Sequence, residues 1–118
     1  MTYHTSEAIG DVLVIWITVP RIVNDLVAFG FKTEILAALD TNVLPKMLLH
    51  FGGVATLSSA LIGALIVLHK KCQGRVWLKL CSLSAEVREP LAITGLDRLF
   101  EIHHDQEDAL AAFGQDRR

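Results

Sequence analysis

The chain alternates between short β-forming runs and longer segments with helical spacing, and this alternation restricts the fold more than any other feature. Residues 11–18, 46–51, 75–81 and 100–103 are apolar or alternating runs of strand length, and segments of helical pattern separate them. Strands that alternate with helices usually pair in parallel, because each helix returns the chain to the same end of the sheet. The pattern therefore predicts an α/β domain.

The N-terminal segment is an exception to that alternation. Residues 2–7 can pair with residues 11–18 as a hairpin, because Gly10 and Asp11 supply a turn between them. The expected order is ββαβαβαβα. We expect a mostly parallel central sheet with an antiparallel N-terminal hairpin, and helices packed mainly on one side.

Capping residues and glycines set the expected helix boundaries. We expect a first helix that is capped by Asn24 or Asp25 and runs to about residue 39, and a second over 59–72. A third should be capped by Ser84 and run to about residue 94, and a fourth should cover 106–113, with Gly74, Gly95 and Gly114 ending the last three. In the first helix the apolar positions are Leu26, Val27, Phe29, Ile35, Leu36 and Leu39. Pro90 leaves two alternatives for the third helix: a kink inside it, or a start near Glu89 with the proline in the first turn.

The composition is that of one small domain with an aliphatic core. Of the 118 residues, 52% are hydrophobic and only 7% are aromatic. We expect a single domain over residues 1–118, with a core of about 2–113 and a flexible tail at 114–118. A formal charge of -2 gives no basic face for nucleic acid.

Three features bear on the cellular compartment. Cys72 and Cys81 are too far apart for a C-x-x-C motif, so we expect free thiols in a reducing cytosol. The first residues lack the basic region of a signal peptide. Residues 51–68 carry no charge, but a glycine pair and serines leave too short a helix to span a bilayer. We therefore expect a cytoplasmic protein without direct membrane insertion.

Two adjacent serines, Ser58 and Ser59, stand between a strand and an apolar helix. A serine at a helix start can cap the free backbone N–H groups, and that is one interpretation of this pair. The other is a surface switch that accepts a phosphate. A hydrolytic nucleophile is disfavoured, because the segment lacks the G-x-S-x-G elbow and no His or Asp is evidently tied to it.

The histidines do not indicate a catalytic or metal site. His103, His104 and Asp105 are better explained as a strand end followed by a helix cap, since adjacent histidines on a strand point to opposite faces. His50 and His69 are expected to be partly buried or surface residues. No Gly-Lys-Ser/Thr follows the glycine pair, so a phosphate-binding loop is not predicted. We expect a non-enzymatic protein without a cofactor or metal.

This order of elements, with a serine pair between a strand and a helix, resembles the STAS domain of bacterial anti-sigma factor antagonists. The resemblance covers essentially the whole chain. Residues 57–65 (LSSALIGAL) look like the family's Asp-Ser-Ser/Thr-Gly-Leu-Gly phosphorylation loop and the helix after it. Residues 78–84 resemble the family's penultimate strand and the turn after it. Residues 87–89 and 94–102 together resemble the segment leading to its last strand, and residues 108–113 resemble its terminal helix.

The resemblance implies a signalling mechanism. In this family an anti-sigma factor with a serine-kinase fold binds the loop and phosphorylates the first serine after the Asp, and a phosphatase resets the switch. The unmodified domain sequesters the kinase and frees the sigma factor. Carried over, the phosphate acceptor is Ser58, with Ser59 as the alternative. The expected partner-binding residues are Leu57, Ser58, Ser59, Ala60, Asn24 and Asp25.

Two residues depart from the family pattern. Leu57 stands where the family has Asp, and Ala60 where it has Gly. Leu57 removes a carboxylate that could orient the serine, and Ala60 adds a methyl where a partner's backbone comes close. An alternative is therefore a STAS adaptor or scaffold module, in a signalling or lipid-transport assembly, that binds partners without phosphorylation. Self-association into a homodimer stays open.

Overall fold

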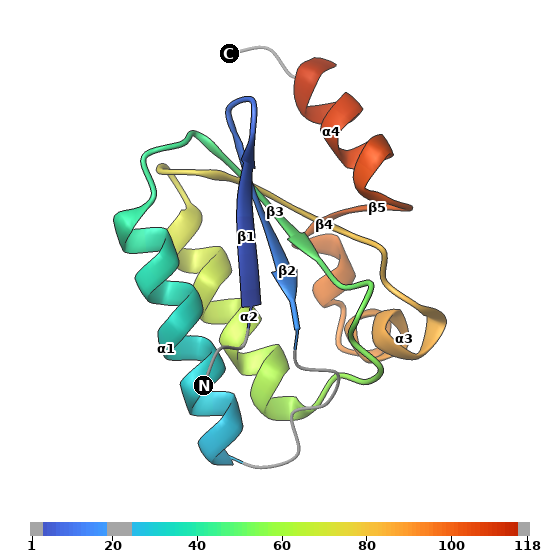
Figure 1. Ribbon diagram of the computed structural model, residues 1–118. Helices are drawn as coiled ribbons and strands as arrows, with labels where there is room; N and C mark the ends of the chain where they lie inside the picture. Colours follow the sequence, from blue (N-terminus) through green and yellow to red (C-terminus); the bar gives the residue numbers. More distant parts are fainter. Residues whose placement is uncertain (1–3, 19–24, 116–118) are drawn as a thin grey trace.

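Five strands form one sheet in the order β1-β2-β3-β4-β5. The computed structural model describes residues 4–18 and 25–115 (Figure 1). β1 (His4–Ile9) and β2 (Val12–Ile17) are antiparallel. β3 (Lys46–His50), β4 (Trp77–Cys81) and β5 (Glu101–His103) each run parallel to the strand before them. The predicted mostly parallel sheet with an antiparallel N-terminal hairpin is confirmed.

The N-terminal hairpin turns through two residues. Ile9 pairs with Val12, so Gly10 and Asp11 alone connect the strands. Gly10 has φ 60°, in the left-handed region that glycine enters without a side-chain clash. A positive φ at the first turn position matches the right-handed twist of the paired strands. The predicted turn is correct, and the first arm lies two residues later in the chain than the expected 2–7.

Three helices cover one face of the sheet. α1 (Asp25–Thr41), α2 (Ser59–Cys72) and α3 (Ala85–Ile93) each connect neighbouring parallel strands. Because such crossovers are right-handed and the strands advance in one direction, the three helices share a face. Their buried side chains join those of the strands in one aliphatic core, which includes Ile15, Ile17, Ile35, Leu39, Leu49, Leu65, Leu68, Leu80, Val87 and Leu91.

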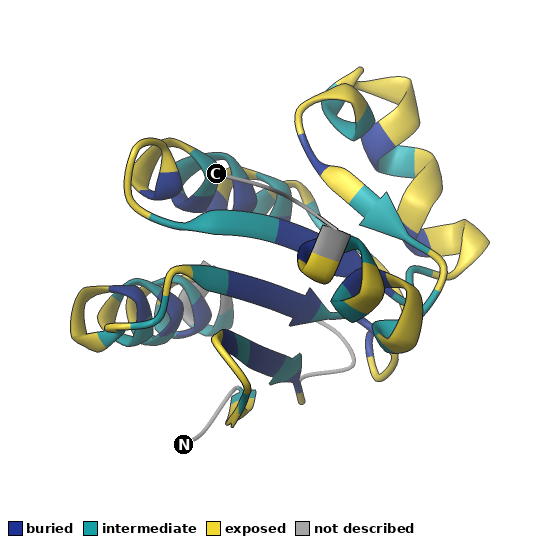
Figure 2. Cartoon of the chain, turned by 90° about the horizontal axis from the view of Figure 1, so that it is seen from above, coloured by how far each residue is buried: buried dark blue, intermediate teal, exposed yellow. Residues whose placement is uncertain are grey.

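A single helix packs on the opposite face. α4 (Gln106–Gln115) places Ala109 and Phe113 against the alternate side chains of the inner strands. Those side chains are Val12, Val14, Leu48 and Cys81. Figure 2 shows the buried residues along the inner strands and on the inward sides of the helices. The sheet therefore lies between a three-helix layer and a one-helix layer.

Pro90 lies inside α3, which begins at Ala85, so a start near Glu89 is wrong. The Ser84 Oγ accepts a hydrogen bond from the Val87 N–H (3.3 Å) and fixes the earlier start. Val87 and Leu91 are fully buried in the core. Their burial and the cap offset the backbone hydrogen bond that the proline cannot make.

One further expectation about helix ends needs correction. Gly114 does not end α4, which continues to Gln115, because this glycine keeps a helical backbone. Gly74 and Gly95 adopt positive φ, as residues that end helices do. A short 3-10 helix, η1 (Leu96–Arg98), follows Gly95 and was not expected. Within residues 4–18 and 25–115, no helix combines the length and apolarity needed to cross a membrane.

Helix α1 buries a different aromatic residue from the one expected. Phe29 is 66% exposed, whereas Phe31 is buried with Ile35 and Leu39. The three buried residues are four positions apart and therefore share one helix face. Phe29 lies outside that stripe, so its assignment as a core-facing position is wrong.

Candidate functional site

The serine segment, residues 51–59, begins at the carboxyl end of β3 with a tight turn. The Phe51 N–H donates to the Cys81 carbonyl (3.0 Å), which ties the end of β3 to β4. The Val54 N–H then donates to the Phe51 carbonyl (3.0 Å) and closes the turn over Gly52 and Gly53. Phe51 and Val54 are both buried, so the turn is anchored to the core at each end.

Ser58 is the N-cap of α2. Its backbone is extended (φ -90°, ψ 163°), and its Oγ accepts a hydrogen bond from the Leu61 N–H (3.2 Å). Its carbonyl accepts the first helical hydrogen bond, from the Ile62 N–H (3.0 Å). The capping interpretation of this serine is therefore correct. The hydroxyl accepts in the cap, which leaves its own hydrogen to donate elsewhere.

The residues around Ser58 differ in how far they face solvent. Ser59 is exposed, while Leu57, Ser58 and Ala60 are half-buried. Leu57 and Ala60 pack against the core of the three-helix face. Leu57 therefore anchors the segment to the domain. A charged aspartate in the same half-buried position would lose part of its hydration, which costs free energy. The exposed part of this segment consists of Gly52, Gly53, Ala55, Thr56 and Ser59.

The electrostatics at this helix start favour an anion. The first turn of α2 contains no acidic residue, so no side-chain carboxylate there offsets the positive end of the helix dipole. A phosphate on Ser58 would lie beside free N–H groups at a helix N-terminus. The last turn holds His69, Lys70 and Lys71, which complement the negative end of the same dipole. The sequence of α2 is thus polarised for an anion at its start.

The start of α1 lies beside the start of α2. Both helices begin at the end of the sheet where β2 and β3 finish (Figure 1). Asp25 is the first residue of α1, although its side chain is outside the described part, and Asn24 falls outside the described residues. Phe29, in the second turn, is the large apolar side chain that sequence reasoning placed in the core and that solvent reaches.

The other candidate residues have structural roles. Asp105 caps α4, since its Oδ1 accepts from the Asp108 N–H (2.8 Å). The His103 Nε2 lies 3.3 Å from a Glu101 carboxylate oxygen. The His69 Nε2 lies 3.3 Å from the Gln73 amide nitrogen. In the described part of the chain, no three His, Cys, Asp or Glu side chains gather as metal ligands would.

Both cysteines are buried free thiols. Burial raises the pKa of Cys72 to about 11, and burial also raises the pKa of Cys81. Both side chains are therefore protonated at neutral pH, and a protonated thiol is a poor nucleophile and metal ligand. They act as small apolar side chains of the two cores.

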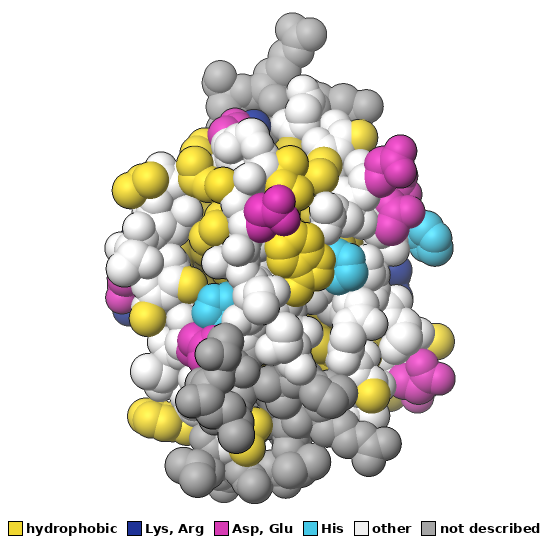
Figure 3. Space-filling view, in the orientation of Figure 1, with side chains coloured by type: hydrophobic (Ala, Val, Ile, Leu, Met, Phe, Trp, Pro, Cys, Tyr) yellow, Lys and Arg dark blue, Asp and Glu magenta, His cyan; other side chains and the backbone are white. Residues whose placement is uncertain are grey.

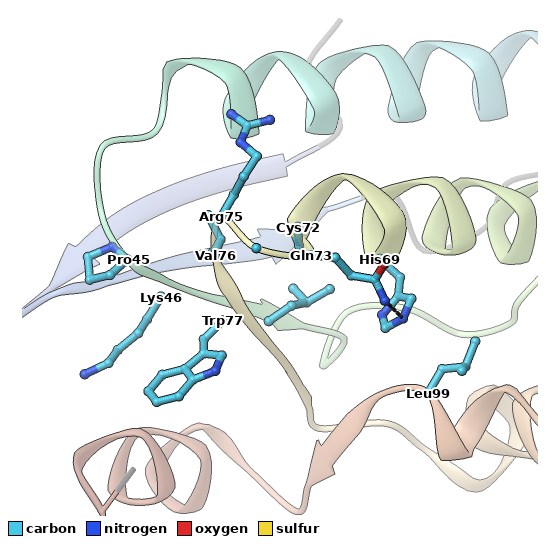
Figure 4. Close-up of a pocket in the computed structure, with 11 residues that line it drawn as sticks. Pro45, Lys46, His69, Cys72, Gln73, Arg75, Val76, Trp77 and Leu99 are labelled. Carbon is cyan, nitrogen blue, oxygen red and sulfur yellow. Dashed lines mark hydrogen bonds between the residues drawn. The ribbon is translucent and has the colours of Figure 1, made fainter. Parts of the chain in front are cut away.

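A pocket of about 720 Å³ lies at the other end of α2, about 20 Å from Ser58 by helix length. It is lined by residues from the start of β3, the end of α2 and the loop after it, the start of β4, and the loop after η1 (Figure 4). The Arg75 and Lys46 side chains point away from each other, toward α1 and toward the α4 side. Each is paired with a carboxylate, Arg75 with Asp40 (3.8 Å) and Lys46 with Asp11 (2.7 Å). These cations do not converge on a common ligand position.

The STAS domain family model matches residues 2–109 of the chain. This chain belongs to the STAS domain family. A search of curated protein sequences found no match.

Solved structures share the STAS fold over nearly the whole chain. An anti-sigma-factor antagonist (STAS) domain protein from Planctomyces limnophilus superposes with a TM-score of 0.82 at 24% identity, covering 95% of this chain and 98% of that one. An anti-sigma factor antagonist from Mycobacterium paratuberculosis gives 0.81 at 21%, covering 92% and 91%. The antagonist SpoIIAA in its unphosphorylated form gives 0.73 at 14%, covering 97% and 99%. At these identities the likeness is one of fold.

Proposed function

We propose that this STAS domain is a non-enzymatic anti-sigma factor antagonist that is switched by phosphorylation of Ser58. Its partner would be an anti-sigma factor with a serine-kinase fold, and a cognate phosphatase would reset it. The unmodified domain would hold the kinase and so free a sigma factor. Residues 1–118 would form one domain, with its core over about 2–113, in the cytoplasm.

The position of Ser58 carries this proposal. Its hydroxyl lies at the N-terminus of α2, half-buried and beside the exposed Ser59, at the end of the sheet where α1 also begins. Family membership and the neighbouring folds named as antagonists make this segment the surface to test. The exposed Phe29 would add an apolar contact on the adjacent helix.

The physical effect of a phosphate at Ser58 follows from its surroundings. The group adds a charge of about -1.5 to -2 and can accept hydrogen bonds from the free N–H groups of α2. The fold should therefore survive modification, because the helix dipole favours the anion. A partner surface that packs on Leu57, Ala60 and Phe29 would have to desolvate that charge. Phosphorylation should weaken docking without unfolding the domain.

Incubation with the cognate kinase-fold anti-sigma factor and ATP, followed by intact mass measurement, tests the proposal. We expect one phosphate on the wild type and on Ser59→Ala, and none on Ser58→Ala. Ser59→Ala is the matched control because it removes the neighbouring exposed hydroxyl and leaves the cap. A phosphate that persists in Ser58→Ala would show that another residue is the acceptor.

The same experiment decides between a switch and an adaptor. A stable complex without phosphate transfer would support the alternative of a STAS adaptor or scaffold module. No complex with such a kinase would contradict the antagonist function itself. Sedimentation of the free domain over a range of concentrations would test whether it forms a homodimer.

A further inference from the structure

His50 lies at the end of β3, next to the turn that begins the serine segment. Its Nδ1 accepts a hydrogen bond from the Gly52 backbone N–H (3.0 Å). Its Nε2 lies 3.4 Å from the Ser82 Oγ. Ser82 follows β4 directly and has φ 64°, a left-handed backbone that non-glycine residues rarely adopt. The two sides of the imidazole thus bridge the ends of β3 and β4.

The imidazole also packs tightly against Gly52. A Cβ at position 52 would come within 2.5 Å of the His50 Cε1 and 3.0 Å of the Nδ1. Any side chain at that position would therefore push the ring away from the turn. The glycine and the histidine fit each other by contact as well as by hydrogen bond. These are two separate geometric observations on one pair of residues.

The hydrogen bond from Gly52 fixes the state of the imidazole. A backbone N–H can only donate, so the His50 Nδ1 must carry a lone pair. The ring is then neutral with its hydrogen on Nε2, from which it donates to the Ser82 Oγ. A protonated imidazole has a hydrogen on both nitrogens, and its Nδ1–H would face the Gly52 N–H. The charged ring is incompatible with this turn.

We propose that neutral His50 is a positioning residue of the serine segment, holding the turn from Phe51 to Val54 in place, and that protonation of His50 releases this turn. The turn is the only stretch between β3 and the residues that lead to Ser58, so its geometry sets where the segment starts. The role in partner docking rests on the proposed function, whereas the hydrogen bond and its response to protons do not.

The surroundings of His50 support a neutral ring near pH 7. Burial lowers the pKa of His50 from its ordinary value of 6.5. Its direct neighbours are uncharged: the Trp16 ring on β2, with centroids 6.1 Å apart, and Ser82 after β4. The titratable and charged residues placed on this face of the sheet by strand register are Glu7, Lys46, Lys79, Cys81, Glu101 and His103, and those at the start of α4 are Asp105, Glu107 and Asp108. Cys81, the neighbour of His50 in register, is a neutral thiol because burial raises its pKa.

The sign of the pH effect follows from the lowered pKa. Well above pH 6.5 the ring is neutral in both the folded and the unfolded chain, and the turn is held. As the pH falls below 6.5, the unfolded chain takes up the proton first, so the folded state and its turn lose stability. The serine segment should therefore be most ordered at and above neutral pH.

Nuclear magnetic resonance of the isotopically labelled domain, without any partner, tests the positioning role. In the wild type above pH 7, the imidazole of His50 should show an unprotonated Nδ1 and a protonated Nε2. On acidification, the Gly52 amide signal should shift with the same midpoint as the His50 ring. A hydrogen on Nδ1 at neutral pH, or a Gly52 amide that ignores the titration of His50, would overturn the proposal.

Two variants distinguish the hydrogen-bond acceptor of the residue 50 side chain from the space that this side chain fills. Asn at position 50 can accept from the N–H two residues later, as in an Asx-turn, but it does not titrate. His50→Asn should therefore keep the Gly52 amide protected from hydrogen exchange at all pH values between 5 and about 8. His50→Leu should lower that protection about fivefold, the value of one neutral hydrogen bond. Equal protection in both variants would overturn the role of the acceptor.

A binding measurement then connects the turn to docking. The affinity for the kinase-fold partner should fall with pH below 6.5 in the wild type and stay level in His50→Asn. If the nuclear magnetic resonance results hold and no such partner binds at any pH, the proposed function fails and the positioning role stands. A binding profile that is the same for both proteins would limit the role of His50 to the turn itself.

Discussion

The two faces of the STAS sheet differ in chemistry. Among the described residues, the face under α1, α2 and α3 is aliphatic apart from a few aromatic rings, and its one titratable buried group is the thiol of Cys72. The face under α4 holds Lys79, Cys81 and the ring of His50, together with two tryptophans at its margin. Figure 3 shows hydrophobic side chains with neighbouring histidine and acidic side chains on the front of the molecule.

Because of this difference, one face supplies stability that does not depend on pH, and the other contains the groups whose contribution changes with pH and salt. Burial of aliphatic surface does not depend on pH, so the three-helix face should supply most of the stability under all conditions. The α4 face contains ion pairs and an imidazole, whose contributions change with pH and salt. Ser58 lies at the start of a helix of the first face, and the turn that leads to it is held by a residue of the second.

Truncation in the three-helix core should have the largest effect. Leu65 is 1% exposed in the middle of α2, and Leu65→Ala should lower the free energy of unfolding by about 3 kcal/mol. Ile93, which is 76% exposed at the end of α3, provides the control, and Ile93→Ala should change it by less than about 0.5 kcal/mol. Urea unfolding measures both. Similar losses of unfolding free energy in the two variants would contradict the assignment of Leu65 to the core and Ile93 to the surface.

Changes at the buried cation of the α4 face should have the next largest effect on the free energy of unfolding. Lys79 is 2% exposed, pairs with Glu101, and lies 4.8 Å above the centroid of the Phe113 ring. Glu101→Gln should cost about 1 to 2 kcal/mol in urea unfolding, because it weakens the compensation of a buried charge. Lys79→Met, which removes that charge and keeps an apolar chain, should cost less. Glu107→Gln, at an exposed position of α4, is the control. A larger loss of unfolding free energy in Lys79→Met than in Glu101→Gln would contradict this prediction.

The cap at the serine site should contribute about 1 kcal/mol. Ser58→Ala removes the oxygen that accepts from the Leu61 N–H, whereas Ser59→Ala removes an exposed hydroxyl outside the cap. Thermal unfolding should therefore separate the two variants, with the lower melting temperature for Ser58→Ala. The same melting temperature for both would mean that the cap observed at Ser58 does not stabilise α2 in solution.

The pH dependence of the α4 face should be the smallest effect. Because burial lowers the pKa of His50, the free energy of unfolding should fall as the pH drops below 6.5. The histidine contribution should be absent in His50→Asn, which can be checked by comparing urea midpoints of the two proteins at several pH values. A pH profile unchanged by the substitution would assign the effect to another group.

The elements of the fold could be predicted from the sequence because their signals are local. The range 59–72 of α2 follows from Ser58 as a cap and Gly74 after its end. Phe29 and Phe31 could not be separated in the same way, because α1 is apolar on most sides and several stripes fit its sequence. Contact with the sheet, which is not a local property, decides which of them is buried.

The candidate site could be predicted only in part for the same reason. The cap at Ser58 is a local feature and was foreseen, whereas the core packing of Leu57 depends on how the segment lies on the domain. The role of His50 depends on Ser82 and Trp16, which are 32 and 34 residues away in the chain and meet it only through the register of the sheet. No spacing in the sequence indicates such a contact.

The proposed function depends above all on Ser58 as the phosphate acceptor of an antagonist switch. The most direct measurement is the intact mass of the domain after incubation with its kinase-fold anti-sigma factor and ATP. We expect one added phosphate that is absent in Ser58→Ala, together with loss of the complex on modification. An unmodified mass in a stable complex, or a phosphate that remains in Ser58→Ala, would contradict it.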